Sequence, residues 1–177
     1  MLKISQLDNS QEDEDVIGEQ EHQENLNTLR LYFQNQSPLF VDAAKLVAEL
    51  NPEDIQRISD LEDLPSGAYG ETRSNLPHTV FINKNRTESD IEREHSDKPR
   101  DLIEKWKIAI IGGIIVHEST HAEDIQNGTQ PTESRAEGRE NEFVQKAIEH
   151  LGLAVRGNPM QQAANYRGYI KAVGELL

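Results

Sequence analysis

Residues 102–128 read LIEKWKIAIIGGIIVHESTHAEDIQNG, an apolar run that ends in a His-Glu-x-x-His pattern. The run contains no proline and Asn127-Gly128 supplies a stop signal, so it predicts one long helix. The isoleucines and valine of residues 108–116 occupy nearly every side of that helix, which indicates burial almost all round. Gly112-Gly113 would weaken the helix by about 1 kcal/mol each relative to alanine. Their small size would let another backbone approach closely.

The polar end of this run predicts a zinc site. On a helix, His117 and His121 lie one turn apart on the same face. Two neutral imidazoles so placed can bind one zinc ion at about 2.0–2.1 Å each. Glu118 lies at the adjacent edge, where it can contact a metal-bound water rather than the metal. The alternative is an exposed polar helix end without a metal, but polar groups beside an apolar core are costly unless they are bound to something.

Composition limits the possible classes of protein. The 177 residues suit one domain plus a tail, and 18 Lys and Arg against 32 Asp and Glu give a net charge of −14. This balance argues against binding to nucleic acid or an anionic membrane. The chain has no cysteine, so a zinc ion would be held by histidine and carboxylate. No stretch is long enough to span a membrane and no signal-peptide core is present, so we expect a cytoplasmic protein, with export without a cleaved signal left open.

The N-terminal part of the chain is strongly acidic. Residues 8–24 hold eight Asp and Glu and no Lys or Arg, which predicts that residues 1–24 form a disordered tail after a possible short strand at 1–7. The tail is either a solvated segment or a regulatory pro-segment that places a carboxylate on the zinc. We expect residues 25–177 to form the folded domain.

Most of this domain is predicted to be helical. Residues 25–50 suggest two helical pieces, the second starting at Pro38, and Asn51-Pro52 begins another helix. Residues 61–77 suggest a loop or irregular hairpin, and His78–Asn83 is the best strand. The polar residues 84–100 predict a long loop that could edge a cleft, with His95 as a surface residue in it. Further helices are predicted at about 133–151 and near the C-terminus.

The helix at about 133–151 carries a row of carboxylates. Its apolar stripe of Phe143, Val144, Ala147, Ile148 and Leu151 continues towards the N-terminus as Glu140, Glu137 and Glu133. Three or four residues separate neighbours in this row, so they share one helix face. A third metal ligand is expected in this row.

These residues resemble the zincin metallopeptidases of the gluzincin branch. The resemblance is carried by His117, Glu118 and His121, by the turn at Pro131, and by Glu133-Ser134-Arg135-Ala136-Glu137 opening the next helix. Residues 140–159 are faintly similar to small single-domain or bacterial effector-type gluzincins, and the whole resemblance covers residues 78–170. The metzincin pattern fits poorly, because it requires glycine and histidine where this chain has Asp124 and Asn127.

The resemblance implies a fold and a ligand set. The expected fold is α+β and mostly helical, with a small mixed sheet beside the motif helix and His78–Asn83 as the substrate-facing edge strand. Glu133 is the implied third ligand of one zinc ion per chain, and Glu137 is an acid that orients a ligating histidine. Both glutamates lie on the same helix face, so exchanged roles stay open.

The resulting functional hypothesis is a zinc metalloendopeptidase acting on a peptide or protein. Three protein ligands leave one zinc position open for water, which Glu118 would deprotonate before protonating the leaving amine. Tyr166 is the candidate oxyanion donor, followed by Tyr169 and Arg167, although the tyrosines could equally be packing residues. The alternative is a non-catalytic metal-binding module for protein interaction with a vestigial His-Glu-x-x-His site.

Overall fold

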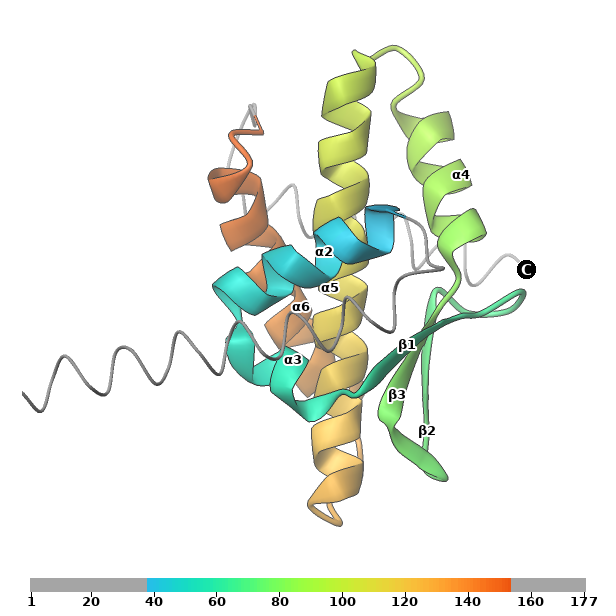
Figure 1. The fold of residues 1–177 in the computed structure, drawn as a ribbon, viewed down its shortest axis with the longest axis vertical. Helices are drawn as coiled ribbons and strands as arrows, with labels where there is room; N and C mark the ends of the chain where they lie inside the picture. The colour runs from blue at the N-terminus through green and yellow to red at the C-terminus, as the bar shows by residue number, and fades with distance from the viewer. Residues whose placement is uncertain (1–37, 154–177) are drawn as a thin grey trace, which may run out of the picture.

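A single long helix organises the computed structural model, which describes residues 38–153. Helix α5, Arg100–Gln126, follows Pro99 and runs the length of the molecule (Figure 1). Its middle is buried on all sides, as the sequence predicted. The helix ends at Asn127, and Gly128 adopts a φ of 68°, a left-handed conformation that glycine adopts without strain. The predicted helix and its stop signal are therefore confirmed.

Three helices cover α5 on the side away from the sheet. Helix α2, Pro38–Leu50, crosses α5, and α6, Glu133–His150, returns along it after the turn at residues 127–132 (Figure 1). The short α3, Pro52–Arg57, contacts both α2 and α5. Each of α2 and α6 buries one apolar stripe, which gives the helices their orientation on α5.

The sheet has three strands in the order β1-β3-β2. Strand β1, Asp60–Asp63, pairs in parallel with β3, Leu76–Ile82, and β2, Gly70–Arg73, pairs with β3 in the antiparallel direction. The expectation that His78–Asn83 forms an edge strand is wrong, because β3 lies between two partners. The four-residue strands β1 and β2 lie in or at the edge of the region 61–77, for which a loop or irregular hairpin was predicted. The sequence did not predict them as strands because such short polar segments show little alternation of apolar and polar residues.

The polar segment after β3 is a helix, so the prediction of a long loop at residues 84–100 is wrong. Helix α4, Lys84–Glu94, begins where the Asn83 side chain accepts a hydrogen bond from the Arg86 N–H, and it packs on α5. Its buried face consists of Thr87, Asp90 and Ile91. Only one of these residues is apolar, so hydropathy gave almost no helical signal. His95 ends α4 and stacks on Trp106 with ring centroids 5.8 Å apart.

The mixed three-stranded sheet and the surrounding helices confirm the α+β class. Within residues 38–153, no helix combines the length and the apolar character needed to cross a membrane. Several predictions fall outside the described residues: the acidic tail, the strand at 1–7, the first helical piece of 25–50, and the C-terminal helix with Tyr166, Arg167 and Tyr169.

The double glycine of α5 is a close-packing site for α6. A Cβ atom on Gly112 would lie 2.7 Å from a ring carbon of Phe143, and one on Gly113 would lie 2.7 Å from a Val144 methyl carbon. Side chains of α6 therefore fill the space that the sequence suggested for a neighbouring backbone. Phe143 is fully buried, and protein interiors are densely packed, so we expect its ring to have little room to move.

Glycine-to-alanine substitutions in α5 and α6 should have opposite effects on stability. Gly112→Ala gains about 1 kcal/mol of helix propensity but overpacks the Phe143 contact, which typically costs about 1–3 kcal/mol. Gly138→Ala, in α6 with no atom within 4 Å of its added Cβ, should stabilise the fold by about 0.5–1 kcal/mol. Denaturant unfolding measures both. Equal stabilisation by the two substitutions would contradict tight packing at Gly112.

Candidate metal centre

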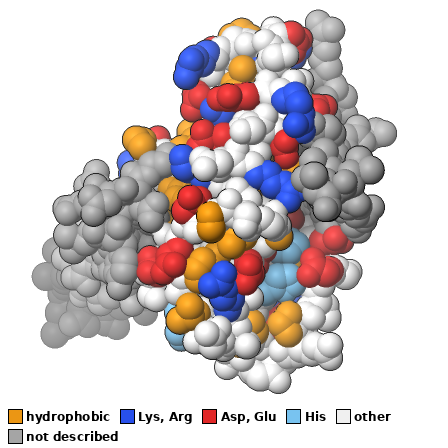
Figure 2. All heavy atoms as spheres, turned by 90° about the vertical axis from the view of Figure 1, so that its right-hand side faces the viewer, with side chains coloured by type: hydrophobic (Ala, Val, Ile, Leu, Met, Phe, Trp, Pro, Cys, Tyr) orange, Lys and Arg blue, Asp and Glu red, His pale blue; other side chains and the backbone are white. Residues whose placement is uncertain are grey.

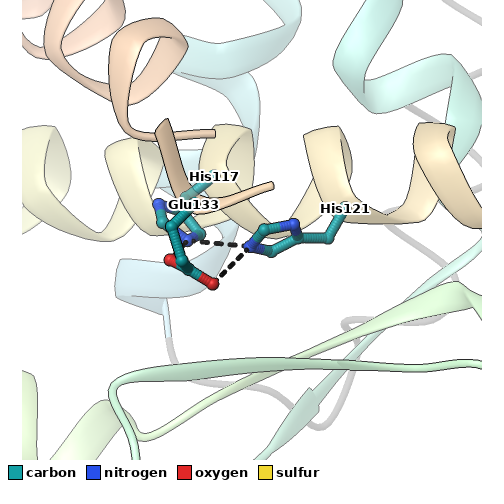
Figure 3. A group of neighbouring side chains, drawn as sticks. All are labelled: His117, His121 and Glu133. Carbon is teal, nitrogen blue, oxygen red and sulfur yellow. Dashed lines mark hydrogen bonds and ion pairs between the residues drawn. The ribbon is translucent and has the colours of Figure 1, made fainter. Parts of the chain in front are cut away.

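Two imidazoles of α5 meet at a common point. The Nε2 atoms of His117 and His121 lie 3.1 Å apart, and their side chains are 17% and 12% exposed (Figure 3). The one-turn spacing on α5 brings them together, as the motif predicted. Each imidazole therefore directs its Nε2 atom to the same partly open position at the surface of the helix.

The first residue of α6 supplies a carboxylate at this point. The oxygens of Glu133 lie 3.4 Å from His117 Nε2 and 3.3 Å from His121 Nε2. Each imidazole faces a different oxygen, so the carboxylate can meet an ion through one oxygen or both (Figure 3). Among residues 38–153, His117, His121 and Glu133 are the one group of three or more possible ligands whose atoms converge, all within 4.8 Å of one another.

The spacing of these atoms fits a zinc ion. Ligand atoms at about 2.0–2.1 Å from a tetrahedral zinc are about 3.3 Å from each other. The distance of 3.1 Å between the two Nε2 atoms is close to this edge length. The 3.4 and 3.3 Å distances involve two different oxygens of Glu133, and with one atom taken from each residue the three atoms lie within 4.8 Å of one another. Without a metal, hydrogen bonds and ion pairs of the two imidazoles with each other and with the Glu133 carboxylate would give the same distances. The donor set of two histidines and one glutamate leaves the fourth position for water or substrate.

Glu118 lies beside this group but outside it. Its side chain is covered by β2, and the residue is only 6% exposed. The Thr72 hydroxyl lies 2.9 Å from Glu118 Oε2 and 2.9 Å from the Glu118 carbonyl oxygen, so it can donate to either. A Cβ atom on Gly70 would lie 2.7 Å from Glu118 Oε1, so only glycine leaves room for this carboxylate.

The environment of Glu118 favours its protonated form. Burial raises the pKa of this carboxyl to about 7, although the neighbouring His117 and the Thr72 hydroxyl act in the opposite direction. A carboxyl with a pKa near neutrality can both accept and donate a proton at neutral pH. A divalent cation at the adjacent ligands would lower this pKa and favour the carboxylate.

Glu140 belongs to the row of carboxylates in which a third ligand was expected, but it contacts a histidine from outside the ligand group. Its Oε2 atom lies 2.9 Å from His117 Nδ1, the ring nitrogen that points away from the ligand group. The resemblance gave the role of orienting a histidine to Glu137, but the carboxylate at this nitrogen is that of Glu140. Glu140 lies seven residues, or about two turns, after Glu133 on the same face of α6, so helical spacing placed it in this row but did not predict its contact with His117.

The hydrogen bond to Glu140 distinguishes the two histidines. Burial disfavours the charged form of His117, but Glu140 and the other nearby carboxylates outweigh it and raise the His117 pKa above its ordinary value. Burial and the neighbouring His117 lower the pKa of His121. A proton on His117 Nδ1 leaves its Nε2 lone pair free for a metal. Figure 2 shows histidine side chains reaching the surface beside acidic side chains on the sheet side of the molecule.

Comparisons with models of protein families, with curated proteins and with solved structures found no match for this chain. The candidate site therefore rests on its own geometry. Of the residues predicted for it, the structure brings together His117, Glu118, His121 and Glu133, whereas Tyr166 lies outside the described residues.

Zinc content should depend on the three converging side chains. The parent protein should retain about one zinc per chain after dialysis, as expected for three protein ligands. His121→Ala should lose the metal because it removes a ligand, and Glu133→Gln should weaken binding because it removes the anionic one. Elemental analysis measures the stoichiometry. A His121→Ala protein with full zinc content would contradict this ligand set.

Glu140 and Glu137 can be compared directly. Glu140→Gln removes the charge that orients His117 and should weaken zinc binding about 10–100-fold. Glu137→Gln is the matched control, one turn away on the same helix face, and should weaken binding less. Competition with a zinc-binding dye gives both affinities. A larger loss in Glu137→Gln would restore the role that the resemblance implied for Glu137.

Proposed function

We propose that this protein is a zinc-dependent peptidase that hydrolyses peptide bonds with an activated water. The observation that carries the proposal is the arrangement of four side chains on two helices. Two imidazoles and one carboxylate converge at ligand spacing, and a second, buried carboxylate lies beside them without joining the group. A purely structural zinc site needs no such additional carboxylate and has no open position.

In this proposal His117, His121 and Glu133 hold the metal. A zinc ion bound there would polarise the substrate carbonyl and lower the pKa of the attacking water. Glu118 accepts the proton of that water and then donates it to the leaving amine. The Thr72 hydroxyl holds the Glu118 carboxyl in one orientation, so the base does not have to be ordered during the reaction.

The geometry of the sheet suggests where a substrate would bind. Strand β2 contacts β3 on one side only within the described chain, and its residues Gly70 and Thr72 lie against Glu118. An extended peptide adding to the free edge of β2 would pass beside the candidate site. The substrate-facing strand is therefore proposed to be β2 instead of His78–Asn83.

Two parts of the proposal depend on the sequence alone. Tyr166, with Tyr169 and Arg167 behind it, remains the candidate donor to the oxyanion, and the cytoplasm remains the proposed compartment.

One observation favours the alternative, a non-catalytic metal-binding module for protein interaction: the 6% exposure of Glu118 limits the access of water to the base. Measured turnover decides between the two functions.

Replacement of Glu118 tests the proposed chemistry. Glu118→Gln keeps the size of the side chain but removes the basic carboxylate, so it should lower turnover by roughly 10² or more, as expected for loss of a general base. Zinc content and melting temperature should stay close to those of the parent. Cleavage of a complex peptide mixture, followed by mass spectrometry with and without a chelator, measures the activity.

Two results would contradict the proposal. Loss of zinc in Glu118→Gln would make Glu118 a ligand, and undiminished activity would exclude it as the base. A zinc-loaded parent that cleaves no peptide in the mixture would support the interaction module.

A further inference from the structure

A second polar cluster lies on the opposite side of the motif turn from the two histidines. Its centre is Asp54 of α3, whose side chain is completely buried. The Oδ1 atom accepts hydrogen bonds from Arg57 and from Ser119, each at 3.0 Å. The Oδ2 atom accepts from Asn51 at 3.2 Å and from Arg139 at 2.9 Å. We call Asp54, Ser119 and Arg139 the Asp54 cluster; its members come from α3, α5 and α6.

A buried carboxylate such as that of Asp54 is costly unless hydrogen-bond donors and positive charges surround it. Burial raises the pKa of Asp54, and the donors around it, Arg139 first, act in the opposite direction. Two guanidinium groups and two neutral donors occupy both oxygens, and they offset part of the cost of burying the charged form. Since Ser119 is one of the two middle residues of the His-Glu-x-x-His pattern, this cluster holds the motif turn itself.

The same cluster fixes the position of α6 along α5. Arg139 also lies 3.3 Å from Glu123 of α5, and Arg135, one turn earlier, bonds to Glu123 and Asp124. The residue after Arg139 is Glu140, which contacts His117. These contacts leave little freedom for α6 to slide or rotate against the motif helix.

Glu133 depends on this fixed position more than any other candidate ligand. Its side chain is 74% exposed, so it has little packing of its own to place it. It is the first residue of α6, two residues before Arg135, the first arginine of α6 that contacts α5. The position of the Glu133 carboxylate is therefore set by the contacts that Arg135 and Arg139 make further along α6.

We infer that the Asp54 cluster is a positioning device for the candidate metal centre, which sets the spacing between the histidines of α5 and Glu133 of α6. The inference rests on the metal centre proposed above. It assigns to Asp54, Ser119 and Arg139 an effect on metal affinity and coordination geometry. A merely structural role would give these residues an effect on stability alone.

The test compares two cations that each hold two or more carboxylates, the half-buried Arg139 and the buried Lys107. Arg139→Met removes the guanidinium and keeps a long side chain. Lys107→Met is the matched control: Lys107 is 3% exposed and bonds to Glu92 and Glu104 at 2.6 and 2.9 Å, but its partners belong to α4 and α5 and not to the site. Both substitutions should lower the melting temperature. Only Arg139→Met should weaken zinc binding, by about tenfold or more, in the range seen for residues that orient ligands.

Zinc affinity is measured by competition with a zinc-binding dye, at a temperature where both variants are folded. The visible absorption of the cobalt-substituted protein reports the coordination geometry and should change only in Arg139→Met. Arg139→Lys should recover part of the affinity. If Arg139→Met does not fold, Ser119→Ala removes one donor to Asp54 with little loss of volume, and it should shift affinity in the same direction.

The possible failures are separable. Parent-like zinc affinity in Arg139→Met, or in Ser119→Ala where the first variant does not fold, would overturn the positioning role. An equal loss of affinity in Lys107→Met would also overturn it, since the effect would then follow stability. A parent that binds no zinc would overturn both proposals. Zinc binding by the parent with the expected variant pattern supports this inference whether or not peptide cleavage is found.

Discussion

The burial of helix α5 on every side is the constraint on which the rest of the structure depends. The apolar run from Ile108 to Val116 has almost no face that can be left in water, so helices cover one side and the sheet the other. The motif turn emerges at the end of this buried stretch, between α6, α3 and β2. Each side of the turn therefore meets a different element, and one turn of helix can contact a ligand group, a buried ion pair and an edge strand at once.

The polar residues of this turn divide their contacts by direction. His117 and His121 face the start of α6, Glu118 faces β2, and Ser119 faces α3. All of these directions follow from successive rotation of about 100° per residue along one helix. Each of these residues therefore contacts its neighbouring element directly and not through the apolar core.

The parts of the fold that the sequence predicted are those with dense apolar patterns. Helices α5 and α6 and the strand containing Val80–Ile82 were recognisable because their buried residues are apolar and regularly spaced. Helix α4 was missed because Thr87 and Asp90 are buried there in place of apolar residues, and β1 and β2 are too short for an alternating pattern. The same limit applies to the site. Spacing along α5 predicted the convergence of His117 and His121, and the resemblance to the gluzincins implied Glu133. The contacts of Thr72 and Asp54 join residues 46 and 65 positions apart and have no local signature.

The missing side chain at Gly70 has a consequence for protein engineering. Any Cβ at residue 70 would collide with the side chains of Glu118 and Ile114. Residue 70 therefore cannot be changed from glycine without moving the Glu118 carboxylate. Alternation along the strand puts Glu71 and Arg73 on the other face, where Arg73 lies over the Phe81 ring. A library intended to alter what the strand recognises should therefore randomise residues 71 and 73 and keep residues 70 and 72 fixed.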